Sequence, residues 1–257
     1  MTKIMAVTNQ KGGVGKTTTT VNLAASLAAA KKRVLLVDLD PQGNATMGSG
    51  INKGDLELTV YNVLLGESTV AQARITSDKG RYDVLPANRE LAGAEIELVD
   101  MDDREVRLKR QLLAVEHEYD YILVDCPPAL NLLTLNGLCA ARSVMIPMQC
   151  EYYALEGLSD LVNTIRKVRE NLNPDLEIEG LLRTMFDPRN SLAQQVSDQL
   201  QQHFGDKVYR TVIPRNVRLA EAPSFGVPAL HHDALSKGTQ AYLALAGELM
   251  NNASITN

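Results

Sequence analysis

The stretch of this 257-residue chain that is best suited to chemistry is NQKGGVGKTT, at residues 9–18. Glycines allow backbone N–H groups to turn inward around phosphate oxygens, and the N-terminus of a following helix adds the positive end of its dipole. In such a loop the ammonium of Lys16 would reach the β- and γ-phosphates of a nucleotide, and the hydroxyl of Thr17 would ligate Mg²⁺. The general pattern GxxxxGKS/T is not met literally, because Gln10 stands at its first glycine and a second lysine, Lys11, precedes the glycines. The alternative is a glycine-rich turn that binds nothing.

Carboxylates at the ends of two apolar runs complement this loop. Asp125 follows Ile122-Leu123-Val124, where it can hold the shell of a magnesium ion through water. Asp38 and Asp40 end another run, and one of them could orient an attacking water while the other caps the following turn. A purely structural role, as caps at the ends of strands, is the alternative for all three aspartates.

These residues need a scaffold, and the chain offers alternating strands and helices. A helix is expected from Lys16 to about Ala30, and another over 154–172, where leucine, isoleucine and valine recur at three- and four-residue steps until Asn173-Pro174. Continuous apolar strands are typical of parallel sheets buried on both faces. Strands are expected at 3–9, 33–40, 82–87, 121–128, 143–149, 176–186 and 207–214.

The predicted fold class is therefore α/β, with a doubly wound, mainly parallel sheet flanked by helices and the ligand at the carboxyl ends of the strands. One domain over residues 1–257 is expected, with 251–257 as a flexible tail. The last helix, about 239–250, has an apolar face that is expected to dock on its own domain.

Composition restricts the class of protein further. The chain is 45% hydrophobic and has a net charge of −5, which is ordinary for a globular protein. No apolar run approaches 18 residues, and the N-terminus breaks into glycines too early for a signal peptide. Three widely spaced cysteines fit a reduced compartment better than a disulfide framework. These features predict a cytoplasmic location.

Several motifs together resemble the ParA/Soj-type chromosome-partitioning ATPases, in the deviant Walker A (MinD/ParA) group of P-loop NTPases. The resemblance runs from about residue 2 to about 249. Its motifs are KGGVGKTT with the leading Lys11, VDLDPQGNAT (37–46), ILVDCPP (122–128), CEYYALEGL (150–158) and VIPRNVRLAEAPSFGVP (212–228).

The resemblance implies roles for individual residues. Lys11 would cross an ATP-sandwich dimer to phosphate bound in the partner subunit, as an arginine finger does elsewhere. Asp40 would be the switch-I aspartate required for hydrolysis, and Asp125 the Walker B aspartate. The other implied contacts are Gly12, Gly13, Val14, Gly15, Lys16, Thr17 and Thr18 with the nucleotide, Met185, Pro214 and Asn216 around the adenine, and Arg189 and Arg218 with nonspecific DNA.

The implied function is ATP-driven DNA segregation. Mg²⁺ and ATP would form a homodimer that binds duplex DNA without sequence preference on the nucleoid. A centromere-bound partner of the ParB class would then stimulate slow hydrolysis and release. No membrane partner is expected, because a membrane-surface helix normally has a basic polar face and Glu248 is the one charged residue in 239–250.

A basic segment is consistent with DNA binding. Residues 183–218 contain six basic residues (Arg183, Arg189, Lys207, Arg210, Arg215 and Arg218) against three aspartates (Asp187, Asp198 and Asp206). A solvated face is the structural alternative. The chain lacks tryptophan and is 4% aromatic, which disfavours a base-stacking platform for single strands.

Other classes of protein remain open at this point. A MinD-like membrane-cycling ATPase would share the loop, but it needs a basic amphipathic anchor, and NNASITN (251–257) is uncharged. A metabolic enzyme of the nitrogenase-iron-protein or cobyrinate-synthetase type is a third candidate, although Cys126, Cys139 and Cys150 fit an iron–sulfur role poorly. A sequence-specific regulator is disfavoured, because the loop begins within ten residues of the start, which leaves no room for a preceding helix-turn-helix.

Overall fold

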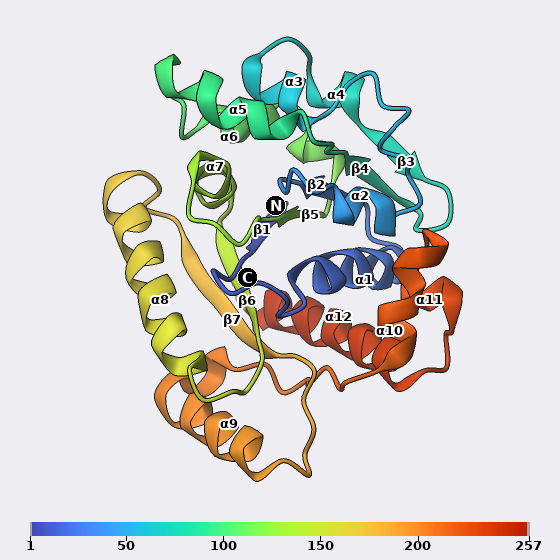
Figure 1. The fold of residues 1–257 in the computed structure, drawn as a ribbon, viewed down its shortest axis with the longest axis vertical. Coiled ribbons are helices and arrows are strands. Elements are labelled where there is room, and N and C mark those ends of the chain that lie inside the picture. The colour runs from blue at the N-terminus through green and yellow to red at the C-terminus, as the bar shows by residue number, and fades with distance from the viewer. Residues whose placement is uncertain (1, 256–257) are drawn as a thin grey trace.

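A seven-stranded sheet forms the centre of the computed structural model, which describes residues 2–255 (Figure 1). Its strand order is β3-β4-β2-β5-β1-β6-β7, and all neighbours pair in parallel except β3 and β4, which are antiparallel. The strands are β1 (Lys3–Val7), β2 (Val34–Asp38), β3 (Ile75–Ser77), β4 (Tyr82–Leu85), β5 (Tyr121–Asp125), β6 (Ser143–Met148) and β7 (Glu177–Arg183).

Helices cover both faces of this sheet, which confirms the predicted fold class. Along β1, Ile4 and Ala6 belong to one apolar core, whereas Met5 and Val7 belong to the other. The first core includes side chains of α3, α5, α6, α7, α8 and α9, and the second those of α1 and α12. The helices are α1 (Lys16–Ala29), α2 (Asn44–Gly48), α3 (Val60–Leu65), α4 (Val70–Ala73), α5 (Leu91–Glu97), α6 (Arg107–Leu113), α7 (Leu132–Ala140), α8 (Ala154–Asn171), α9 (Ser191–Phe204), α10 (Val217–Glu221), α11 (Ala229–His232) and α12 (Lys237–Ile255).

The sheet register brings the predicted site to one edge. β5 lies between β1 and β2, and Asp125 at its end is level with Val7 on one side and Asp38 on the other. The loop after β1 and the aspartates that end β2 and β5 therefore meet at the carboxyl ends of three adjacent strands. Ligands bind at this edge in doubly wound sheets.

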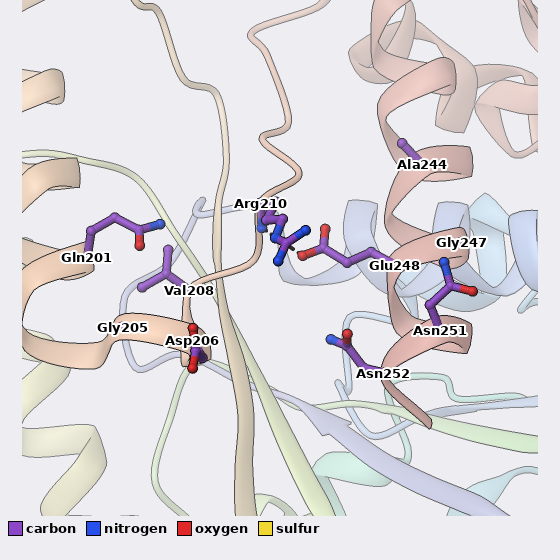
Figure 2. Close-up of a pocket in the computed structure, with 10 residues that line it drawn as sticks. All are labelled: Gln201, Gly205, Asp206, Val208, Arg210, Ala244, Gly247, Glu248, Asn251 and Asn252. Carbon is purple, nitrogen blue, oxygen red and sulfur yellow. Dashed lines mark hydrogen bonds between the residues drawn. The ribbon is translucent and has the colours of Figure 1, made fainter. Parts of the chain in front are cut away.

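The strand predicted at 207–214 is wrong. The segment makes two isolated bridges with its neighbours, Leu181–Val208 and Phe186–Pro214. Tyr209 N and Ile213 N still donate hydrogen bonds to carbonyls of β7. Between them the ladder is interrupted, and Glu248 of α12 accepts hydrogen bonds from the backbone N–H groups of Arg210 and Thr211, at 2.7 and 2.9 Å. Figure 2 shows the Glu248 side chain pointing toward Arg210 from the neighbouring helix. The short antiparallel strand β3, conversely, was not predicted, because three residues carry no periodicity.

The C-terminal helix is longer than predicted. α12 continues to Ile255, so residues 251–255 of the predicted tail are helical, and 256–257 lie outside the described residues. Tyr242, Leu245 and Leu249 are buried in the core shared with α1, which confirms that this helix docks on its own chain. Within the described residues, the helices are too short or too polar to cross a membrane.

Candidate nucleotide-binding site

The loop between β1 and α1 has the backbone of a phosphate cradle. Gly13 and Gly15 have φ angles of 73° and 88°, the left-handed region that favours glycine. Gly15 is the N-cap of α1, and within residues 2–255 no side chain caps this helix. The first N–H groups of α1 are therefore left for a ligand, and an anion is the ligand that the helix N-terminus favours.

Lys16 is a buried cation at the base of this loop. Its Nζ donates a hydrogen bond to the backbone carbonyl of Lys11 at 3.1 Å, across the loop. Burial lowers the pKa of Lys16, while the nearby charges of Asp125 and Asp40 act in the opposite direction. A buried ammonium beside the uncapped N-terminus of a helix is suited to the charge of a polyphosphate.

The predicted metal ligands lie together. Thr17 Oγ1 donates a hydrogen bond to Asp125 Oδ2 at 2.7 Å, and Thr20 Oγ1 donates to Asp125 Oδ1 at 2.9 Å. Hydroxyl and carboxylate oxygens are the donors that Mg²⁺ prefers, with water completing the shell. The residues present therefore fit a magnesium ion beside the phosphate loop. Thr20 was not predicted; its signal is the i, i+3 spacing from Thr17, which places both hydroxyls on one face of α1.

The two aspartates after β2 have different environments. Asp38 is fully buried and accepts hydrogen bonds from the backbone N–H and the hydroxyl of Thr46, at 2.8 and 2.7 Å, and from Asp40 N at 3.1 Å. Asp38 therefore stabilises the turn between β2 and α2. Asp40 is half-buried, and its Oδ1 accepts a hydrogen bond from Gln42 N at 2.9 Å. Of the two, Asp40 has the carboxylate that a water molecule at the site can reach.

Burial raises the pKa of both Asp125 and Asp38. For Asp125 the proximity of Asp38 adds to this effect, and hydrogen bonds from Thr17 and Thr20 reduce it. For Asp38 the hydrogen bonds from Thr46 are the main opposing influence. A cation at this edge of the sheet would stabilise the charged form of both carboxylates.

This burial predicts an unusual pH dependence for the metal-free protein. A carboxyl whose pKa is raised by folding stabilises the native state below its unfolded pKa of about 4, and this contribution is lost as the pH rises toward the folded pKa. In the wild type we expect the free energy of unfolding to decrease as the pH rises from about 5 to 7.5. Asp125→Asn should make this slope shallower by up to about 1.4 kcal/mol per pH unit.

Urea titrations in EDTA at several pH values measure the slope. Asp120→Asn is the control, since Arg33 lowers the pKa of Asp120 and that carboxylate stays charged in this range. An unchanged slope in Asp125→Asn would contradict the prediction.

The residues predicted around the adenine line one pocket. Met185, Pro214 and Asn216 surround a cavity of about 160 Å³ that begins at Gly15 and Thr18 of the phosphate loop and α1. The side-chain oxygen of Asn216 caps α10 by accepting hydrogen bonds from two backbone N–H groups, which leaves its NH₂ group as a donor. Sequence reasoning missed other lining residues, namely Thr184, Ile213, Arg215, Leu219, Ala220 and Tyr242.

The side chain of Lys11 is held outside the loop. Its ammonium forms an ion pair with Glu151, in the loop between β6 and α8, and both side chains are about half exposed. Two exposed tyrosines, Tyr152 and Tyr153, follow Glu151 and pack edge to face. Lys11 thus lies on the surface of the protomer, at the rim of the site.

The predicted DNA-binding arginines lie on the surface, with partners in their own chain. Arg189 is 89% exposed and pairs with Asp187, and it lowers the pKa of that carboxyl. Arg218 is 48% exposed and lies between Glu221 and Asp233. Arg183 is buried, where it donates hydrogen bonds to Ser197 Oγ and the carbonyl of Tyr209. The basic surface formed by residues 183–218 is therefore smaller than the six basic residues in this segment of the sequence indicated.

A larger cleft, of about 930 Å³, lies elsewhere, between α9 and α12 (Figure 2). Polar side chains such as Gln201, Asp206 and Asn251 line it together with Arg210 and Glu248. Its lining, taken over residues 2–255, includes none of the predicted nucleotide-binding residues. Size alone therefore does not identify the site.

A phosphate loop with paired lysines, on a doubly wound sheet with aspartates at the neighbouring strand ends, defines a P-loop NTPase of the deviant Walker A type. A family profile described as an AAA domain matches residues 2–178. The chain is 59% identical to the sporulation initiation inhibitor protein Soj of Bacillus subtilis, over 98% of this chain and 100% of that protein. It is 53% identical to the chromosome partitioning protein ParA of Myxococcus xanthus, over 96% and 88% respectively. The chain belongs to the Soj/ParA family of chromosome-partitioning ATPases.

Solved structures agree on the fold. Cobyrinic acid a,c-diamide synthase from Mycobacterium smegmatis, with bound ATP analog and magnesium, superposes with a TM-score of 0.88 at 38% identity, covering 100% of this chain and 98% of that chain. The cell division ATPase MinD of Pyrococcus furiosus gives 0.80 at 25% identity, covering 98% and 99%. The partition proteins share more sequence with this chain than either structure does.

Proposed function

We propose that this protein is an ATP-dependent DNA-segregation switch. In this proposal Mg²⁺ and ATP join two protomers in a sandwich, the dimer binds duplex DNA without sequence preference, and a ParB-class partner stimulates slow hydrolysis that releases it. The protein would act in the cytoplasm on the nucleoid, and residues 1–257 would form one ATPase domain. Family membership and the nucleotide site support this proposal.

The single observation that carries the proposal is the different placement of the two loop lysines. Lys16 is buried and its ammonium contacts its own loop, whereas Lys11 is exposed at the rim of the site and forms an ion pair with Glu151. This difference supports a division of roles in which Lys16 binds phosphate in its own protomer and Lys11 reaches a second protomer. Exposed Tyr152 and Tyr153 beside it offer apolar surface for that contact.

The proposal assigns each predicted residue a place in the cycle. Residues 11–18 would bind the phosphates, with Thr17 and Asp125 (through water) at Mg²⁺, and Met185, Pro214 and Asn216 around the adenine. Asp40 would orient the attacking water. Arg189 and Arg218 would contact DNA phosphates, and two such surfaces in one dimer bind more tightly than one, which makes DNA affinity depend on nucleotide.

We expect Arg218→Glu to reduce ATP-dependent binding to nonspecific duplex DNA by about 10-fold or more at low salt. The substitution removes a phosphate contact and places a third carboxylate beside Glu221 and Asp233. Fluorescence anisotropy with a labelled duplex and a nonhydrolysable ATP analogue measures this change. ATP-dependent dimerisation should remain.

Arg110→Glu is the matched control. Arg110 is an exposed arginine of α6 that also pairs with an aspartate, Asp103. The helix packs on the opposite face of the sheet from α10, which carries Arg218 (Figure 1). The charge change is identical, so a general electrostatic effect would weaken DNA binding equally in both variants. Equal affinities in the wild type and Arg218→Glu would remove Arg218 from the DNA surface.

A MinD-like membrane-cycling ATPase is the alternative, favoured by the structural similarity to MinD. The apolar face of α12 is buried against α1, which leaves that face unavailable for lipid. Flotation of the full chain with anionic liposomes and ATP distinguishes the two functions, because the segregation proposal predicts that the protein stays with DNA and not with lipid.

A further inference from the structure

The loops that carry Lys11 and Glu151 are connected by an ion pair and by the side chain of Asn9. The distance from Lys11 Nζ to Glu151 Oε2 is 2.5 Å, and the two side chains are 50% and 51% exposed. The backbone N–H of Lys11 donates a hydrogen bond to Asn9 Oδ1 at 3.0 Å. Asn9 Nδ2 in turn donates to the carbonyl of Pro147 in β6 at 2.8 Å. The tip of the phosphate loop is therefore tied to the segment that leads into α8.

The pair with Glu151 holds the Lys11 ammonium at the rim of its own protomer, so this pair competes with any contact that Lys11 makes to a phosphate in another protomer. We propose that Glu151 is a positioning residue, whose carboxylate holds Lys11 within its own protomer until a second nucleotide-bound protomer displaces it. The inference rests on the proposed function, in which Lys11 acts across the dimer. Glu151 touches neither nucleotide nor reacting atoms in this arrangement, and it acts through Lys11.

The same segment also contacts the adenine pocket. Gln149, two residues before Glu151, donates a hydrogen bond from Nε2 to the sulfur of Met185 at 2.9 Å. Met185 lines the pocket and has a φ of 48°, a conformation that a non-glycine side chain rarely adopts. Residues 149–151 therefore link the wall of the nucleotide pocket at one end to Lys11 at the other. A nucleotide that binds beside Met185 could therefore alter the ion pair between Lys11 and Glu151 through residues 149–151.

The expected effect follows from the exposure of the pair. An exposed ion pair shifts an equilibrium by up to about fivefold, and dimerisation breaks one such pair in each protomer, so the association constant should rise by up to about 25-fold in Glu151→Gln. Sedimentation velocity of the full chain with Mg²⁺ and a nonhydrolysable ATP analogue measures the constant. Glu156→Gln, an exposed glutamate in the first turn of α8, is the matched control and should leave it unchanged.

Two further arms test whether Glu151 acts through Lys11. Glu151→Gln should have no effect in a Lys11→Ala background, whereas Glu151→Asp, which keeps the charge, should behave more like the wild type. The difference between Glu151→Gln and wild type should also shrink between about 0.05 and 0.5 M salt, because screening already weakens the pair. This salt arm decides the question if Lys11→Ala dimerises too weakly to measure. Thermal unfolding checks that each variant is folded.

The outcomes separate this inference from the proposed function. The role of Glu151 is overturned if Glu151→Gln leaves dimer association unchanged or weakens it. It is also overturned if Glu151→Gln strengthens association equally in the Lys11→Ala background or at high salt. Neither result affects the ATP-dependent dimerisation of the wild type. A wild type that stays monomeric with Mg²⁺ and ATP overturns the proposed function itself, and this inference with it.

Discussion

Lys11→Ala is expected to lower partner-stimulated ATP turnover by about 10³-fold, since cations supplied across an interface contribute 10³–10⁵ to phosphoryl transfer. The loss should fall on turnover more than on nucleotide affinity, because Lys16 and the loop backbone still bind the phosphates of their own protomer. Phosphate release at saturating ATP, with DNA and the ParB-class partner present, measures turnover. Nucleotide affinity is measured separately with a fluorescent ATP analogue.

Lys31→Ala provides the matched control for the loss of one lysine. Lys31 follows α1 at the end remote from the phosphate loop and is exposed, so its removal should leave turnover unchanged. Wild-type turnover in Lys11→Ala would show that the second lysine has no part in hydrolysis.

Asp40→Ala is expected to reduce turnover by about 10²–10⁴-fold, the usual contribution of a group that positions or deprotonates an attacking water. ATP-dependent dimerisation and DNA binding should persist, because the carboxylate does not line the adenine pocket and is remote in sequence from the arginines. The same phosphate-release assay applies, with DNA binding measured in parallel. A variant that still hydrolyses ATP at the wild-type rate would exclude Asp40 from the mechanism.

Mixing these two variants tests whether Lys11 acts in the partner. In a mixed dimer the Lys11→Ala protomer retains its own Asp40 and receives Lys11 from the Asp40→Ala protomer, so one of the two sites is complete. We therefore expect turnover to recover in the mixture, although each variant alone is inactive. If Lys11 served its own protomer, neither site would be complete and no activity would return.

Much of the architecture could be predicted from the sequence, because the main strands are long apolar runs buried on both faces. The run that ends at Asp125 and the one that ends at Asp38 became β5 and β2, and the parallel register brings their carboxylates to the phosphate loop. The segment 207–214 has the composition of a strand, but its few backbone hydrogen bonds to the neighbouring segments form isolated bridges. Glu248, distant in sequence, supplies the acceptor for two of its N–H groups, and such a contact leaves no local signal.

The site was predictable where one motif contains it and less so where several segments converge. Residues 11–18 are contiguous, and the strand before and the helix after them fix their geometry. The pocket predicted to hold the adenine combines residues near 15, 185 and 215 with Tyr242 of α12, which no spacing in the sequence connects. The ion pair between Lys11 and Glu151 joins residues 140 positions apart, and Arg183, which counts as basic in the sequence, is buried by contacts with α9 and the 207–214 segment.

Binding to a nonspecific duplex tests the central claim most directly, with the wild-type protein compared in ATP, in ADP and without nucleotide, each at two salt concentrations. The proposed switch predicts binding with ATP alone, and that binding should weaken as salt rises, because phosphate contacts release counterions. DNA binding that is equal in the three nucleotide states would contradict a nucleotide-gated switch. An absence of DNA binding in every state, with ATP still bound, would contradict the segregation function.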